Sequence, residues 1–185
     1  MTEREKMIKG EIYDPMKEDI IKEQGRYQDR LWEFNKLKPT AIEEKIAFMK
    51  EIFAECGDGC YIELPIWSNW GCHNVHLGNN VYINSNCTFV DDGQIYIGDN
   101  VLFGPNVTLA TANHPFDKEQ RRKALQYNKD IIIEENVWLG ANVVVVPGVR
   151  IGKNSVIGAG SIVTKDVPEG VLAFGNPCRV IKKIA

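Results

Sequence analysis

The stretch VWLGANVVVVPGVRIGKNSVIGAGSIVTKD, residues 137–166, repeats every six residues and decides the fold. It divides into the hexads VWLGAN, VVVVPG, VRIGKN, SVIGAG and SIVTKD. The first and third residues of each hexad are mostly aliphatic, glycine often follows the third, and Asn, Asp or Gly usually closes the sixth. A fixed internal period is the signature of a repeat architecture.

The same period extends toward the amino terminus with one interruption. Upstream of residue 137 lies IIIEEN, and before a pause at residues 113–130 lie VTLATA, VLFGPN, IYIGDN, CTFVDD, VYINSN and VHLGNN, the last beginning at Val75. Alternating aliphatic residues predict short strands with one buried face, and Gly or Asn predicts corners that need a permissive backbone. Such strands bury their faces only by stacking, so we predict a mainly β fold, a solenoid in which each coil forms hydrogen bonds with the next.

This repeat resembles that of the hexapeptide-repeat transferases, whose triangular parallel β-helix implies three hexads per coil. Three hexads per coil define which residues stack. The hexad from Val81 stacks on those from Val101, Val137 and Ser155, which places Asn84, Gly104, Gly140 and Gly158 in one corner column, with Ser85, Pro105, Ala141 and Ala159 beside it. Small side chains along this edge allow a thin ligand to approach the backbone amides. The same stacking places Asp92 one coil from Ala112, and His114 follows closely.

Residues 1–57 lack the six-residue period and are predicted to form a helical segment that packs on the prism of residues 58–185. Asp14-Pro15 can open a helix that ends before Pro39, with Ile20, Tyr27, Leu31 and Phe34 on one face. Thr40 and Glu43 form a capping-box pattern for a second helix, whose expected apolar stripe is Ile42, Ile46, Met49 and Phe53. Within the prism we expect an inserted loop at 113–130 and a C-terminal tail from about residue 168.

Composition excludes several classes of function. The 185 residues are 44% hydrophobic and 25% charged, with 22 Lys and Arg against 25 Asp and Glu, so a net charge of −3 argues against nucleic acid as the main partner. The sequence contains neither a signal-peptide pattern nor an apolar run long enough for a membrane span, so we expect a cytoplasmic protein. Five cysteines without a CxxC pair predict free thiols rather than disulfides or a structural zinc site.

The interrupting loop carries the strongest candidate for chemistry. Long loops in compact domains are uncommon and often functional, and this one contains Asn113-His114-Pro115. His114 is the candidate general base, with Asp92 close enough to orient its imidazole or to hold a hydroxyl group. The alternatives are a loop histidine bonded to a neighbouring carbonyl and an ordinary corner aspartate.

Nearly the whole chain resembles one family. The stretches NVYINSNCTFVDDG, IGDNVLFGPNVTLATANHP, VWLGANVVVVPGVRIG and SVIGAGSIVTKDVPEGVLAFGNPCRVI, together with EIYDP and WEFN near the start, are similar to the maltose and galactoside O-acetyltransferases. The resemblance implies a left-handed, triangular hexapeptide-repeat prism. It also implies transfer of acetyl from acetyl-CoA to a sugar hydroxyl without a catalytic metal, by a homotrimer with active sites between subunits.

The resemblance also assigns roles to residues. His114 matches the catalytic histidine, and Asn84 matches the asparagine that stabilises the transition state, although a plain corner residue is the alternative for Asn84. Asp92, Asp14 and Asn69 match positions that hold the sugar, and Ser68 is an alternative to Asn69 because IWSNWG differs from the family pattern.

For acetyl-CoA, the resemblance implies backbone contacts at Ala141 and Ala159, polar contacts at Thr164, Lys165, Arg179 and Lys182, and a wall formed by Trp138. Cations suit the phosphates of the donor. Ala141 and Lys182 stand where other members carry serine and arginine, and lysine lacks the planar fork of arginine. Trp67 and Trp70 either line the sugar pocket or fill space beneath the helices.

Other functions stay open at this level. The γ-type carbonic anhydrases share the prism and bind zinc through three histidines, and this chain has His73, His76 and His114. A non-catalytic scaffold is a second alternative. Acetyltransferases acting on a xenobiotic, serine or an amino sugar are a third, and the EIYDP start favours the sugar branch over them.

Overall fold

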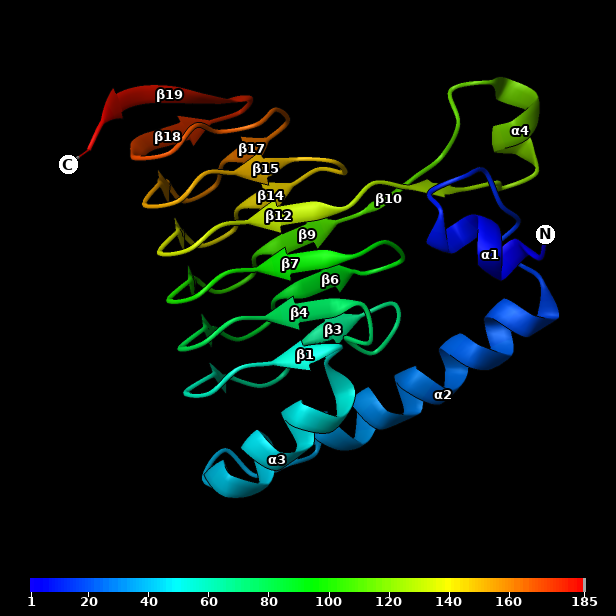
Figure 1. The fold of residues 1–185 in the computed structure, drawn as a ribbon, viewed down its shortest axis with the longest axis horizontal. Helices are drawn as coiled ribbons and strands as arrows, with labels where there is room; N and C mark the ends of the chain where they lie inside the picture. Colours follow the sequence, from blue (N-terminus) through cyan, green and yellow to red (C-terminus); the bar gives the residue numbers. More distant parts are fainter. Residues whose placement is uncertain (185) are drawn as a thin grey trace.

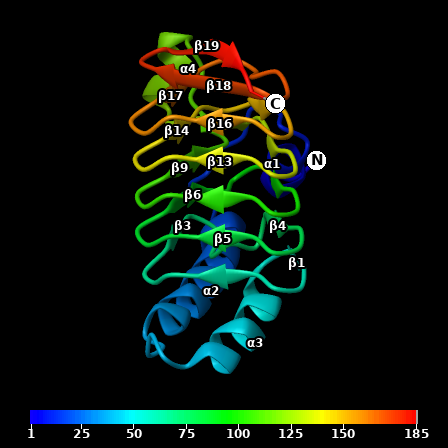
Figure 2. The same ribbon diagram turned by 90° about the vertical axis from the view of Figure 1, so that its left-hand side faces the viewer.

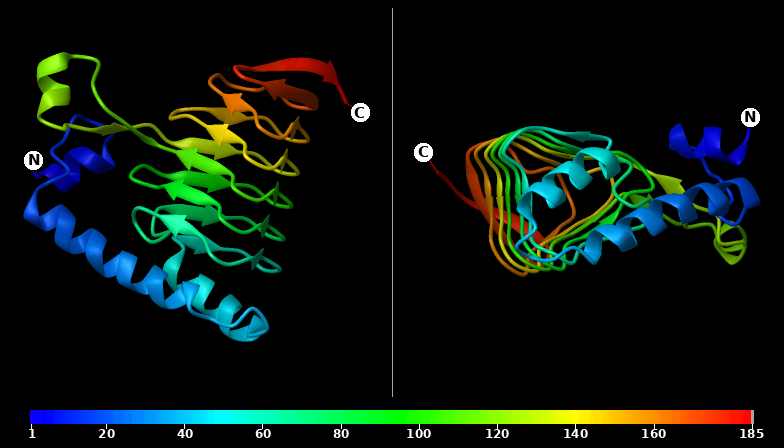
Figure 3. Two further views of the ribbon diagram at one scale, coloured as in Figure 1. Left: turned by 180° about the vertical axis from the view of Figure 1, so that it is seen from behind. Right: turned by 90° about the horizontal axis from the view of Figure 1, so that it is seen from below.

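The computed structural model describes residues 1–184 and consists of a stack of coils with helices at one end (Figure 1). Seen along the stack, the coils superpose as a rounded triangle (Figure 3). The predicted mainly β fold, a parallel β-helix with an amino-terminal helical segment, is confirmed.

Each side of the triangle is one parallel sheet, and the sheets are named here sheet 1, sheet 2 and sheet 3. Sheet 1 contains β1 (Glu55–Cys56), β4 (Val75–Leu77), β7 (Ile95–Ile97), β12 (Ile131–Ile133) and β15 (Arg150–Ile151). Sheet 2 contains β2 (Tyr61–Ile62), β5 (Tyr82–Ile83), β8 (Leu102–Phe103), β13 (Trp138–Leu139), β16 (Val156–Ile157) and β18 (Val171–Gly175), with β19 (Cys178–Lys183) antiparallel at its edge. Sheet 3 contains β3 (Trp67–Ser68), β6 (Thr88–Val90), β9 (Thr108–Ala110), β14 (Val144–Val145) and β17 (Ile162–Val163).

The predicted stacking of the hexads is confirmed by the strand register. Tyr82 pairs with Leu102, Leu102 with Trp138, and Trp138 with Val156. Residues at the first and third hexad positions fill the interior, so a continuous aliphatic core runs the length of the stack. Figure 2 shows the coils of this stack from the side.

The closing residue of the hexad explains how the chain turns each corner. In nine of the twelve hexads this residue is an Asn or Gly with positive φ, for example Asn142 at 59° and Gly148 at 86°. Asparagine and glycine enter this left-handed region more readily than other residues. The Asn and Gly periodicity is therefore a direct requirement of the corner geometry.

One coil precedes the repeats that the sequence reveals. The strands β1, β2 and β3 pair with β4, β5 and β6, although residues 55–70 do not show the hexad pattern. The helix α3 (Ile42–Ile52) lies across the open end of this coil (Figure 1). Because α3 covers one side of the first coil, that coil has different packing partners from the others.

The amino-terminal helices differ from the sequence prediction in detail. They are α1 (Glu3–Ile8), α2 (Glu18–Asn35) and α3, so the helix expected after Pro15 begins at Glu18. The capping box predicted at Thr40 is wrong, because Ala41 is the N-cap of α3 and no side chain caps it. A turn in which Ala41 N–H donates to the Lys38 carbonyl moves the helix start one residue along.

The predicted apolar stripe of α3 is also partly wrong. Met49 and Phe53 are buried, but Ile42 and Ile46 are exposed, and Lys45 is buried in their place. The Lys45 amine donates to the Tyr61 hydroxyl at 2.8 Å and to the Ile62 carbonyl at 3.2 Å. These partners satisfy a buried cation, which a hydrophobic pattern does not reveal.

The loop at 113–130 projects from one side of the stack and lies next to α1 (Figures 1 and 3). It is anchored by β10 (Ala112–Asn113) and β11 (Tyr127–Asn128), which pair antiparallel, and it carries the short helix α4 (Lys118–Arg122). Tyr13 forms a two-way backbone bridge with Gln126, which ties the amino-terminal segment to this loop. None of the helices in residues 1–184 has the length and apolar character needed to cross a membrane.

Candidate active site

The predicted site residues gather at two corners of the prism. Asn84, Ala141 and Ala159 lie where the chain passes from sheet 2 to sheet 3. Asp92 and Asn69 lie where it passes from sheet 3 to sheet 1, and His114 follows β10 at the same corner.

Asp92 is the centre of the cluster at the sheet 3 to sheet 1 corner. Asn69 Nδ2 donates to Asp92 Oδ2 at 2.9 Å, and Trp70 Nε1 lies 3.4 Å from Asp92 Oδ1. The Tyr13 hydroxyl also lies 3.4 Å from Oδ1, and Asn128 Nδ2 donates to the Asp92 backbone carbonyl at 2.9 Å. The structure therefore brings Asp92 and Asn69 together, as a pair of polar groups held from several elements.

His114 is exposed and is oriented by the backbone of its own loop. Its Nδ1 lies 2.8 Å from the Leu125 carbonyl oxygen, which can only accept a hydrogen bond. Nδ1 must therefore carry the proton, and in the neutral ring Nε2 then holds the free lone pair. The hydrogen bonds found within residues 1–184 include none to Nε2. Of the two roles expected for Asp92, orientation of the His114 imidazole is wrong. Nδ1 is bonded to the Leu125 carbonyl instead, as the alternative of a loop histidine bonded to a neighbouring carbonyl predicted.

Asp14 lies near this corner without contacting Asp92. Its Oδ1 accepts from the Met16 N–H at 3.0 Å and its Oδ2 lies 3.4 Å from Lys17 Nζ, so it shapes the entry to α2. The neighbouring Tyr13 reaches Asp92 instead. Burial and the negative charge of Asp92 raise the pKa of Tyr13, which keeps its hydroxyl protonated as a donor.

Tyr13 and Asn128 are site residues that sequence reasoning missed. The sequence signal that could have identified Tyr13 is its position in EIYDP, directly before Asp14. Asn128 has no such signal, because it reaches the site only through the pairing of β11 with β10.

At the other corner, Asn84 presents the donor end of its side chain. Its Oδ1 accepts from the Ser85 N–H at 2.8 Å, and no partner of Nδ2 lies within the described chain. The amide nitrogen is therefore the free end, as a group that stabilises negative charge requires.

The coils pack closely against one another along the small-residue edge beside Asn84. A Cβ added at Gly140 would lie 2.6 Å from the Ala159 nitrogen, and one at Gly104 would lie 2.6 Å from the Ala141 nitrogen. Ala159 is exposed and Ala141 half-buried, so the backbone along this edge is accessible.

The predicted cationic residues lie toward the carboxyl-terminal end of the stack. Lys165 and Arg179 line one cavity of about 240 Å³, together with Cys178 and Val180. Thr164 precedes Lys165 in the chain, whereas Lys182 lies further along β19 and does not line this cavity. The structure thus unites two of the four predicted polar contacts.

The tryptophans have different environments. Trp138 is 53% exposed on the outer face of sheet 2, so its ring is available to a ligand or a partner. Trp67 is half-exposed and lines a cavity of about 320 Å³ with Trp32 and Asn69. Trp70 is fully buried against Met7, Tyr13 and Ile20, so it fills space, as one of the two interpretations predicted.

The two corners do not meet within one chain. Residues 86–91 cross sheet 3 between Asn84 and Asp92, and an extended segment of six residues spans roughly 20 Å at about 3.3 Å per residue.

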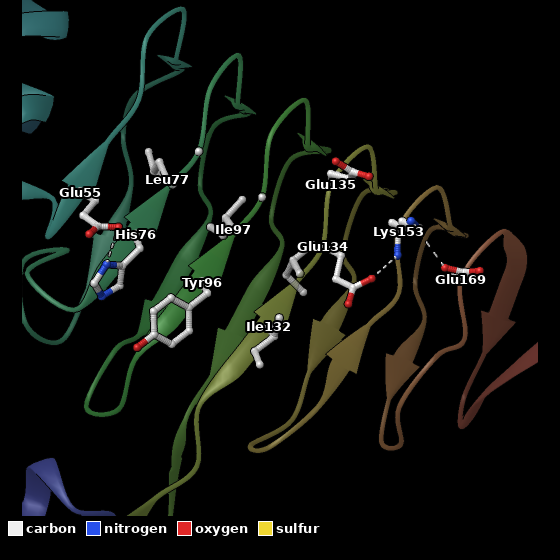
Figure 4. Close-up of a pocket in the computed structure, with 13 residues that line it drawn as sticks. Glu55, His76, Leu77, Tyr96, Ile97, Ile132, Glu134, Glu135, Lys153 and Glu169 are labelled. Atoms are coloured by element: carbon white, nitrogen blue, oxygen red, sulfur yellow. Dashed lines mark hydrogen bonds and ion pairs between the residues drawn. The ribbon is translucent and has the colours of Figure 1, made fainter.

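A cavity of about 610 Å³ lies elsewhere and contains none of the predicted site residues. It runs over the outer face of sheet 1, where His76, Tyr96 and Ile132 stand side by side with Glu55 and Glu134 at its edges (Figure 4). The His76 ring lies 3.1 Å from Glu55 and 2.7 Å from Gln94, and it stacks on Tyr96. Within residues 1–184, no three His, Cys, Asp or Glu side chains converge as a metal site would require.

Two protein-family models match parts of this chain. Residues 6–57 match the family model described as the maltose acetyltransferase hexapeptide capping motif, and residues 130–165 match the bacterial transferase hexapeptide (six repeats). The chain is 51% identical to a galactoside O-acetyltransferase of Lactococcus lactis over 174 residues, which are 94% of this chain and 84% of the relative.

Two solved structures are similar to this chain over its whole length. A maltose O-acetyltransferase from Clostridium difficile has a TM-score of 0.97 at 41% identity, with 100% of this chain and 98% of that chain covered. A galactoside acetyltransferase in complex with coenzyme A has a TM-score of 0.95 at 44% identity, with 100% and 92% covered.

Proposed function

The chain belongs to the maltose and galactoside O-acetyltransferase family of hexapeptide-repeat transferases, and we propose that its acceptor is a sugar hydroxyl and its general base His114. Membership makes it an acetyl-CoA-dependent acetyltransferase. The observation that carries the proposal for His114 is the hydrogen bond of Nδ1 to the Leu125 carbonyl, which leaves Nε2 as the basic nitrogen.

In the proposed reaction, Nε2 of His114 accepts the proton of the acceptor hydroxyl as its oxygen bonds to the acetyl carbonyl carbon. The carbon–sulfur bond of the thioester then breaks, and the departing thiolate takes the proton from the imidazolium. General-base assistance of this kind contributes roughly 10² to 10⁴ in rate.

Asn84 is proposed to donate its Nδ2 group to the carbonyl oxygen as negative charge develops there. A neutral amide can stabilise this charge without giving up a proton, and loss of one such donor costs about 10² to 10³ in turnover. Because Asn84 and His114 lie at different corners, we propose a homotrimer in which each site takes Asn84 from one subunit and His114 from its neighbour.

Asp92 and Asn69 are proposed to hold the sugar, since their paired carboxylate and amide offer both an acceptor and a donor to hydroxyl groups. Asp14, beside Tyr13, is proposed to contact the same sugar from the amino-terminal segment. Ser68 is not proposed for this role, because its hydroxyl is bonded to Asp91.

The donor is proposed to run along the small-residue edge at Ala141 and Ala159, past Trp138. Its phosphates would meet Lys165 and Arg179 in their shared cavity. Thr164, next to Lys165 in the chain, and Lys182, further along β19, are proposed as additional polar contacts.

The deciding experiment is a thiol-release assay with acetyl-CoA and a panel of glucose, maltose, galactosides, serine, chloramphenicol and amino sugars. We expect release with a neutral sugar and unchanged rates in the presence of a chelator. Release with serine, chloramphenicol or an amino sugar alone would assign the chain to another acceptor class of the same fold.

A further inference from the structure

A second carboxylate, Asp91, lies directly beside Asp92 and is entirely buried, with 0% of its surface exposed. Its Oδ1 accepts from the Ser68 hydroxyl at 2.6 Å and from the Trp70 N–H at 2.7 Å. Its backbone carbonyl accepts from Asn74 Nδ2 at 2.7 Å. Three residues of one short loop therefore converge on Asp91.

This loop, residues 68–74, has a backbone that needs such support. Gly71 and Cys72 are consecutive residues with positive φ, 59° and 69°, and Cys72 has a side chain that disfavours this region. The Ser68 hydroxyl also accepts from the Cys72 N–H at 2.6 Å, so Ser68 links the turn to Asp91. A Cβ at Gly71 would clash with the Tyr27 carbonyl, so the loop is also held close to α2.

The repeat itself does not require a charge at this position. The strand register aligns Asp91 with Trp70, Thr111, Pro147 and Lys165 in the neighbouring coils, so the coils fold with apolar, polar or cationic residues there. Asp91 Oδ2 is buried and has no hydrogen-bond partner within residues 1–184. Burial of the carboxyl group raises its pKa to about 6. A group this unfavourable to bury is expected to have a specific role.

The loop that Asp91 holds is the one that reaches Asp92. Asn69 lies between two of the residues bonded to Asp91, and its amide donates to Asp92 Oδ2. Trp70 gives its backbone N–H to Asp91 and directs its indole N–H toward Asp92. The two adjacent carboxylates thus both bind the same loop.

We propose that Asp91 is a positioning residue for the acceptor site, which pins residues 68–72 so that Asn69 and Asp92 present a fixed pair of polar groups to the sugar. The inference rests on the proposed function, since it concerns the site assigned there to the acceptor. It predicts that Asp91 governs acceptor binding without touching the acceptor.

The test compares KM values of Asp91→Ala, Asp91→Asn and wild type, with the sugar that wild type uses best. Asp91→Ala should raise the KM for the sugar at least tenfold and leave the KM for acetyl-CoA within twofold. Asp91→Asn keeps an oxygen that accepts from Ser68 and Trp70, so it should stay within about threefold of wild type. Asp99→Ala is the matched control, because Asp99 also accepts a backbone N–H, from Asn79 at 2.7 Å, at a corner remote from the site.

Ser68→Ala provides a second route if Asp91→Ala fails to fold. It removes one hydrogen bond to Asp91 and should raise the sugar KM alone. Where Asp91→Ala does fold, Ser68→Ala should add little in that background, because both variants release the same loop. Equal losses toward sugar and acetyl-CoA, or an unchanged sugar KM in both variants, would overturn the inference. Failure of the proposed function looks different, because wild type itself would then acetylate no sugar.

Discussion

Asn69 Nδ2 donates to Asp92 Oδ2 at 2.9 Å, across the first two coils of the prism. The two residues are 23 positions apart in sequence, and neither belongs to a strand. Their contact joins an irregular loop in the first coil to a corner residue of the next, at the same corner as His114. This pair is the part of the proposed acceptor site that the isolated chain already forms.

Replacement of His114 by Ala should lower kcat by at least about 100-fold, because it removes the proposed general base. Acetyl-CoA binding should persist, since the proposed donor contacts lie elsewhere. Steady-state kinetics and calorimetric titration measure the two effects separately. His76→Ala, on the outer face of sheet 1, is the control, and near-normal turnover of the His114 variant would remove His114 from its role.

Asp92→Asn should weaken use of the acceptor, because an amide in place of the carboxylate removes a charged acceptor for sugar hydroxyl groups. We expect the sugar KM to rise by about tenfold or more and the acetyl-CoA KM to stay unchanged, since a charged hydrogen bond contributes about 1.5–3 kcal/mol. An equal rise in both KM values would show that Asp92 does not belong to the acceptor site.

Mixing two inactive variants should restore activity if the sites lie between subunits. Asn84→Ala and His114→Ala subunits, unfolded and refolded together in equal amounts, should regain about one quarter of wild-type sites, because each site needs one intact corner from each neighbour. Activity is measured before and after mixing, and light scattering gives the oligomer. A mixture as inactive as its components would contradict the shared site.

Stability should depend on pH through Asp91. Its pKa in the folded protein is about 6 against an ordinary value of 3.8, so the folded state binds this proton more tightly. The stabilisation is fully present below pH 3.8 and is lost as the pH rises through 6, a total of about 3 kcal/mol.

Asp91→Asn should remove this component. Relative to wild type, the free energy of unfolding of the variant should therefore be about 2 kcal/mol higher at pH 7.5 than at pH 4.5. Urea unfolding at one fixed protomer concentration measures the difference. Parallel pH profiles for the two proteins would show that Asp91 titrates normally.

Removal of the cationic side chains that line the 240 Å³ cavity should weaken only the binding of acetyl-CoA. Lys165→Ala and Arg179→Ala should each raise the KM for acetyl-CoA several-fold, and added salt should reduce the difference from wild type. The sugar KM should not change. Lys22→Ala, on the exposed face of α2, serves as the control, and a similar effect there would indicate nonspecific electrostatics.

The prism was predictable from local sequence because its geometry is repetitive. Val137 and Leu139 point inward and Asn142 turns the corner in one hexad, and the equivalent positions of the other hexads have the same tasks. The same residue types therefore recur every six residues, and this period is visible in a single sequence. The stacking of Trp138 on Leu102 and Val156 followed by counting. The coil at 55–70 was not predictable in this way, because α3 covers its open side and relaxes the pattern.

In the candidate site, too, the residues within the repeat were predictable and the contacts outside it were not. The hexads specify the strands and, with the three hexads per coil that the resemblance implies, the corner to which Asp92, Asn84 and Ala141 belong. Contacts outside the repeat depend on loops whose paths no periodicity encodes. Examples are the contacts of Tyr13 with Asp92, of Leu125 with His114, and of Ser68 with Asp91. Only the packing of the amino-terminal segment and the 113–130 loop against the prism brings these groups within hydrogen-bonding distance.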